Sequence, residues 1–150
     1  EGVAMTTFAS QNIGAGFTQR VKQGVRHSLL IVTGITTLLI IICYLFGEPV
    51  LKWITKTDNQ IIIDSAVMYV KVGIWFFYVL GPLFIFRCTL QGIGRKIVPI
   101  VSSGLEMAVK ILSASFLVPV LGYLGVALTE PISWIVMTLL LAVAYYSKPL

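Results

Sequence analysis

Charged residues are scarce in this sequence, and their scarcity excludes a soluble fold. Of the 150 residues, eleven are Lys or Arg and six are Asp or Glu, so 11% are charged while 57% are hydrophobic. Soluble domains carry about 25% charged and roughly 45–50% apolar residues. So few charges cannot cover the surface of a soluble domain of this length. The composition therefore indicates an integral membrane protein and excludes a soluble enzyme, a disordered tail and a disulfide scaffold.

Residues that build reactive or metal sites are also rare. The sequence holds one histidine, His27, with no metal-ligand cluster around it, and no nucleophile elbow or Walker lysine. Its two cysteines, Cys43 and Cys88, lie in or beside apolar runs that the topology below places near opposite membrane faces, which excludes a disulfide. We therefore expect no enzymatic activity, no metal and no cofactor.

The apolar runs predict an all-α integral membrane fold. A helix that crosses about 30 Å of hydrocarbon needs roughly 20 residues. Glu130 alone cannot turn the chain between two helices, so the turn is predicted at 119–123, where Pro119 and Gly122 are strong turn signals. The second helix includes Lys71, which can snorkel to the surface. Four complete transmembrane helices are predicted, at about 28–47, 65–86, 98–118 and 124–146, and residues 1–10 resemble the end of a preceding one.

The basic residues predict an orientation. Loops rich in Lys and Arg lie on the cytoplasmic side of a membrane. One face of the predicted topology receives seven of them: Arg20, Lys22, Arg26, Arg87, Arg95, Lys96 and Lys148. The opposite face receives Lys52 and Lys56. We therefore expect a multi-pass protein of the cytoplasmic membrane with its C-terminus in the cytoplasm. The net charge of +5 then needs no nucleic acid to explain it.

Glu106 and Lys110 are predicted to lie deep in the third helix. Counted from residue 98 at 1.5 Å per residue, they lie about 12 and 18 Å into the hydrocarbon. Each charge costs at least about 2.5–3.5 kcal/mol there, so both should face a bundle interior or an aqueous cavity. Their spacing of four residues places them on one helix face. Three interpretations stay open: a structural ion pair, part of a transport pathway, or a helix that does not cross the membrane.

Two prolines are predicted to break helices. Pro131 follows Glu130 about 9 Å into the fourth helix, where a freed backbone carbonyl must find another partner. An acidic side chain beside a broken helix suggests a hydrated site, as in transporters built on discontinuous helices. Alternatively, Glu130 lies near the outer headgroups. Pro82, after Gly81, predicts either a kink or simple packing in the second helix.

Several short motifs resemble the multidrug and toxic compound extrusion family. Residues 8–16 (FASQNIGAG) with Arg20 resemble the cytoplasmic connector after the second helix of each half. Three further stretches follow in the family's order: 90–95 (LQGIGR) with Pro99, 106–110 (EMAVK), and 122–126 (GYLGV) with 130–134 (EPISW). Together the four stretches resemble the family over roughly residues 5–148.

The resemblance implies a place in a larger protein. Residues 1–150 would be a single membrane-domain fragment, running from the end of helix eight to helix twelve of a twelve-helix, two-lobe transporter. Such proteins export cationic or amphipathic compounds in exchange for Na+ or H+ by alternating access. The resemblance also implies a motif at the cytoplasmic face, made of Gln11, Asn12, Gly14, Gly16, Arg20, Arg87, Gln91, Gly92, Gly94 and Arg95.

The partners implied are the lipid bilayer, the remaining helices of the same polypeptide and small organic cations. Some family members carry an acidic residue on the tenth helix, but residues 65–86 contain none, so the coupling ion stays open. Two alternatives also stay open. One is a flippase for lipid-linked precursors, although its cavity should hold several cations, and the other is a membrane subunit that transports nothing.

Overall fold

The regular structure of this chain is α-helical, which confirms the predicted fold class. The computed structural model describes residues 2–56 and 59–147, and no strand occurs among them. Six helices follow one another along the described chain: α1 (Gly2–Gly14), α2 (Thr18–Thr55), α3 (Gln60–Trp75), α4 (Phe77–Gly92), α5 (Ile97–Leu121) and α6 (Tyr123–Tyr146).

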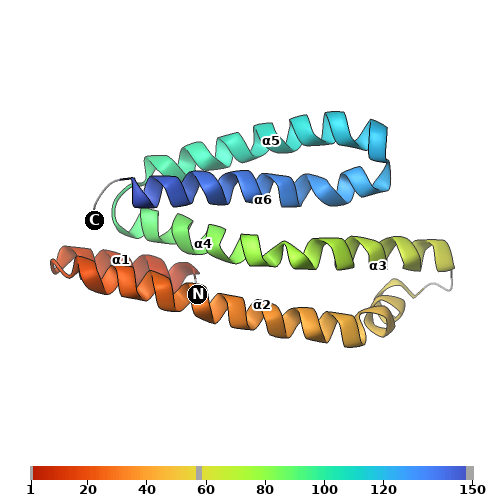
Figure 1. Cartoon of the computed structure of the whole chain (residues 1–150), viewed down its shortest axis with the longest axis horizontal. Helices are drawn as coiled ribbons and strands as arrows, with labels where there is room; N and C mark the ends of the chain where they lie inside the picture. Colours follow the sequence, from red (N-terminus) through yellow and green to blue (C-terminus); the bar gives the residue numbers. More distant parts are fainter. Residues whose placement is uncertain (1, 57–58, 148–150) are drawn as a thin grey trace.

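The helices run back and forth along one axis (Figure 1). The α1–α2 turn, the α4–α5 connection and the end of α6 lie at one end of the bundle, whereas the α2–α3 and α5–α6 connections lie at the other. The first end is the one predicted to gather basic residues. Arg95 and Lys96 lie in the α4–α5 connection, and Arg20, Lys22 and Arg26 lie in the first three turns of α2. Lys148 lies outside the described residues.

Three helices, α2, α5 and α6, are long and apolar enough to cross a membrane, and α3 with α4 forms a fourth candidate if the bent pair counts as one span. Each corresponds to one predicted segment. The clearest difference is the length of α2, whose 38 residues extend well beyond 28–47. Residues 15–17 alone connect α1 to α2, so the basic residues near position 20 lie on the helix. Arg, Lys and Gln are good helix formers, which explains this extension.

The bend in the second predicted span is not where the proline lies. The axes of α3 and α4 differ by 50° at a break around Phe76, whereas Pro82 lies inside α4. A proline removes the hydrogen bond to the carbonyl four residues earlier, here Tyr78, and its ring crowds that turn. The distortion therefore falls on the N-terminal side of a proline. The predicted break at Pro131 is wrong, since α6 continues through it.

The turn predicted between the third and fourth spans is confirmed. Helix α5 ends at Leu121, and Gly122 reverses the chain with a φ of +57°. Glycine is favoured there because that φ strains residues with a Cβ. Gly125 then lets α6 approach α5, because a Cβ at this position would lie 2.5 Å from the carbonyl oxygen of Leu117.

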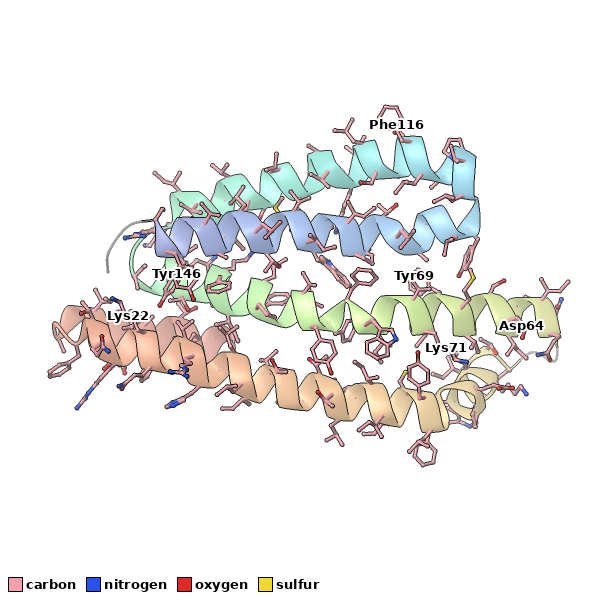
Figure 2. All side chains as sticks on the ribbon, viewed as in Figure 1. Lys22, Asp64, Tyr69, Lys71, Phe116 and Tyr146 are labelled. Carbon is pink, nitrogen blue, oxygen red and sulfur yellow. The ribbon has the colours of Figure 1, made fainter. Side chains whose placement is uncertain are left out.

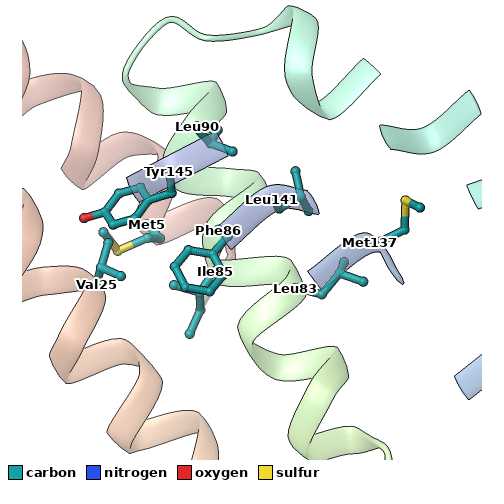
Figure 3. Close-up of a cluster of buried hydrophobic side chains, with 9 residues drawn as sticks. All are labelled: Met5, Val25, Leu83, Ile85, Phe86, Leu90, Met137, Leu141 and Tyr145. Atoms are coloured by element: carbon teal, nitrogen blue, oxygen red, sulfur yellow. The ribbon is translucent and has the colours of Figure 1, made fainter. Parts of the chain in front are cut away.

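The apolar core joins α1, α2, α4 and α6 (Figure 3). Its buried side chains are Met5, Val25, Leu83, Ile85, Phe86, Leu90, Met137, Leu141 and Tyr145. Helix α5 contributes none of them, and no part of its most apolar window is buried within the described chain. Many large apolar side chains are exposed on the outer faces of the bundle, as the helices of a membrane protein require. Helix α5 is therefore a peripheral helix, attached mainly along α6.

Candidate functional site

Four charged side chains from three helices form a continuous ion-pair network. Arg87 of α4 donates from Nη2 to Oε2 of Glu106 on α5 over 2.9 Å. The ammonium of Lys110, one turn further along α5, lies 3.2 Å from Oε1 of Glu106 and 2.9 Å from Oε2 of Glu130 on α6. We call these four residues the charge network. It brings together all three residues predicted to lie at membrane depth.

Measured along the helix axes, the charge network lies well inside the span and not at either end. Arg87 lies five residues before the end of α4, which is about 8 Å at 1.5 Å per residue. Glu106 and Lys110 lie about 14 and 20 Å from the start of α5, and Glu130 lies about 11 Å from the opposite end of the bundle. The network thus extends from the part of the bundle near the α4–α5 connection to the part near the α5–α6 turn.

Shielding decreases along the network. The side chains of Arg87 and Glu106 are each 19% exposed, that of Lys110 is 34% exposed, and that of Glu130 is 40% exposed. Two positive and two negative charges cancel, which lowers the cost of placing them in a medium of low polarity. The Nε of Arg87 is buried and has no hydrogen-bond partner in the described chain. The Glu130 end is therefore the more accessible one.

Arg87 is a correction to the sequence-based topology. It was expected in a loop after the second span, but α4 continues to Gly92 and carries Arg87 within the helix. Gly92 and Gly94, whose φ is +84°, mark the true end of the helix. Glycine after a helix is the usual stop signal, so these two residues were the signal that could have located Arg87 correctly.

The remaining residues of the predicted cytoplasmic-face motif lie at one end of the bundle. They occupy the end of α1, the turn to α2, the first turn of α2, the last turn of α4 and the α4–α5 connection: Gln11, Asn12, Gly14, Gly16, Arg20, Gln91, Gly92, Gly94 and Arg95. Arg95 donates to the carbonyl of Ala144 on α6 over 3.1 Å. A Cβ on Gly92 would lie 2.5 Å from the carbonyl oxygen of Thr6, so this glycine lets α1 pack on α4. Their functional role remains a prediction.

A second set of polar contacts joins α2 to the α3–α4 bend. The hydroxyls of Thr37 and Tyr78 share a hydrogen bond of 2.8 Å, and Nε1 of Trp75 donates to the hydroxyl of Tyr44 over 3.0 Å. Trp75 and Tyr78 lie on either side of the break at Phe76, so α2 holds both arms of the bend. Sequence reasoning missed these contacts, because partners more than thirty residues apart leave no local signal.

Lys71 and Asp64 both lie on α3 (Figure 2). The ammonium of Lys71 lies 5.9 Å from the centre of the Tyr44 ring. Helix α3 begins at Gln60, five residues before the predicted span, and so includes Asp64, which accepts a hydrogen bond from Gln60. Residues 65–86 contain no acidic residue, but the helix begins before them and therefore carries Asp64 in its second turn.

A concavity of about 570 Å³ follows one side of α3, from Asp64 past Lys71 to Phe76. No residue of the charge network lines it. Within residues 2–56 and 59–147, no three His, Cys, Asp or Glu side chains are arranged to hold a metal ion. Both cysteines are free thiols.

Comparison with known proteins places the chain among membrane transporters. A family model described as MatE matches residues 2–116, which include Arg87, Glu106 and Lys110 but not Glu130. A Bacillus subtilis (strain 168) protein named probable multidrug resistance protein YoeA is 29% identical over 151 residues, covering 97% of this chain. The chain spans 31% of that relative's length. No solved structure matches the chain.

Proposed function

The chain belongs to the MatE family, and from this membership we propose that it is part of an exporter of cationic or amphipathic compounds. Export across the cytoplasmic membrane would be driven by exchange for Na+ or H+, with the protein alternating between inward-open and outward-open states. The described helices would form most of the C-terminal lobe. The name of the Bacillus relative, which describes that protein as a probable multidrug resistance protein, supports this proposal.

The charge network is the observation that supports a transport role most directly. Ionisable residues in a membrane are costly, and they face a bundle interior or a water-filled cavity and mark substrate or ion pathways. A pathway requires that part of the network be accessible to water or to a ligand. The network becomes more exposed from Glu106 to Glu130. We therefore assign Glu106, Lys110 and Glu130 to the wall of a pathway, with Arg87 holding Glu106 in place.

The bend between α3 and α4 supports the conformational part of the proposal. Alternating access needs helices that change shape or tilt around a fixed site. The break at Phe76 offers such a point, and its hydrogen bonds to α2 involve side chains that are partly exposed. Movement at the bend would displace α4 and with it Arg87, which contacts Glu106. The bend and the charge network are thus mechanically connected through α4.

Accumulation of ethidium in cells that produce the full-length protein tests this function. Glu106→Gln removes the charge that Arg87 and Lys110 share, so we expect export to fall at least about tenfold, equivalent to about 1.4 kcal/mol of lost stabilisation. The control is Glu48→Gln, because Glu48 pairs with Lys52 in an exposed contact of 2.8 Å near the end of α2. Export by Glu106→Gln at the rate of the unmodified protein, at equal amounts in the membrane, would contradict the pathway role.

A further inference from the structure

The two carboxylates of the charge network differ in how many partners their oxygens have. Glu106 accepts from Arg87 at one oxygen and from Lys110 at the other. Glu130 contacts Lys110 through Oε2, and in the part of the chain that the structure describes its Oε1 has no partner. Glu130 is also the most exposed member of the network. It is therefore the one carboxylate in the network with room for another donor.

Lys110 can leave Glu130 without leaving the network. Its ammonium is shared between the two carboxylates, and Glu106 would keep both Lys110 and Arg87 as partners. Only the contact of 2.9 Å to Glu130 would break. The reverse exchange, in which Glu106 gives up Lys110, would leave a more shielded carboxylate with fewer partners. The structure thus favours exchange at Glu130 over exchange at Glu106.

The surroundings of Glu130 select a cationic ligand. The free oxygen of its carboxylate can only accept hydrogen bonds while ionised. Pro131 has no N–H, so the carbonyl of Ala127, four residues before it, lacks its helical partner and adds negative partial charge to this part of α6. An ammonium, that of Lys110, already lies against the carboxylate. A ligand that replaces it must likewise carry positive charge.

We propose that Glu130 is a binding site for organic cations and that Lys110 is its tethered competitor. The proposal deepens the function proposed above, because it names the group that receives a cationic substrate. With no ligand bound, the lysine neutralises Glu130 inside the membrane. An incoming cation displaces the ammonium toward Glu106. Return of the lysine to Glu130 then assists release of the ligand on the other side.

This arrangement predicts opposite effects for two single substitutions. When a binding site is free only for a fraction of the time, the apparent dissociation constant rises in inverse proportion to that fraction. If Lys110 occupies Glu130 about nine-tenths of the time, Lys110→Met tightens cation binding about tenfold. Glu130→Gln removes the countercharge and weakens binding by a similar factor. In the Glu130→Gln background, Lys110→Met has no further effect, because the competitor has lost its target.

Fluorescence titration of ethidium on the purified full-length protein measures these four affinities. Lys71→Met is the matched control, because Lys71 lies against Tyr44 on another pair of helices and should leave the affinity unchanged. Lys110→Gln serves as a second variant that keeps a polar side chain at this position. It should also tighten binding if competition by the ammonium, rather than packing, is the cause.

The proposal is overturned if Lys110→Met and Lys110→Gln bind ethidium no more tightly than the unmodified protein does. Equal tightening by Lys110→Met with and without the Glu130→Gln substitution would overturn it too, since the effect would then not pass through the carboxylate. Export is measured separately. Tighter binding through Glu130 in a protein that exports nothing leaves the site in place and rejects the transport function. Normal export with no effect of the Lys110 substitutions on binding rejects the site at Glu130 and leaves the transport function in place.

Discussion

At the scale of single residues, the meaning of a charge depends on its depth in the membrane. Glu48 and Lys52 form an ion pair of 2.8 Å, but both side chains are about half exposed. Exposed pairs of this kind contribute little to stability, because water and salt screen the attraction. Arg87 and Glu106 are separated by a similar distance but are largely shielded, so removing one partner leaves a poorly solvated charge. The same chemistry is therefore a surface feature in one pair and a structural requirement in the other.

Arg87→Met should destabilise the full-length protein by about 1–3 kcal/mol, because Glu106 loses a charge-assisted hydrogen bond in a shielded site. The double variant Arg87→Met with Glu106→Gln should lose less than the sum of the two single variants, since the uncompensated charge is gone. Thermal unfolding in detergent measures these differences. Lys52→Met should change the midpoint little. Strict additivity of the Arg87 and Glu106 substitutions would show that the two side chains do not interact.

At the scale of helices, the sequence was informative where the signal is local. The turn at Gly122 could be predicted, because glycine and proline constrain the backbone at or next to their own positions. The break at Phe76 could not, because a proline indicates a distortion but the packing of the preceding turn decides where the helix yields. Arg87 and Glu106 lie 19 residues apart on different helices, so their pairing depends on how α4 and α5 dock.

The contact between α5 and α6 gives a test at this scale. A Cβ on Gly125 would overlap the backbone of Leu117, so Gly125→Ala must push the two helices apart. Overpacking of this kind costs about 1–3 kcal/mol. The shift would also separate Lys110 from Glu130, so export should fall together with the unfolding midpoint.

The matched control for this substitution is Gly34→Ala, since no atom lies within 4 Å of a Cβ built at that helical position. Replacement of an unhindered helical glycine by alanine favours the helix by up to about 1 kcal/mol. If Gly125→Ala and Gly34→Ala shift the unfolding midpoint in the same direction, the close packing of α5 on α6 is wrong.

At the scale of the whole molecule, the described helices have a core on one side and an open face on the other. Helix α5 carries the centre of the charge network, yet its most apolar window is not buried by any described residue. The chain also spans only 31% of its Bacillus relative. Substrate sites in transporters of this kind form between repeats of the same polypeptide. We therefore expect the network to complete its pathway only in the full-length protein.

The most direct test of the central claim is whether water and substrate reach Glu106 in the full-length protein. Glu106→Cys is made in a protein that already carries Cys43→Ser and Cys88→Ala. A membrane-impermeant thiol reagent is then applied with and without ethidium. A cysteine in place of Phe116, an exposed apolar residue further along α5, is the control and should stay unreactive. We expect the cysteine at position 106 to be labelled and ethidium to slow its labelling. A cysteine at 106 that never reacts, in a protein that still folds, would contradict the claim that the charge network lines a transport pathway.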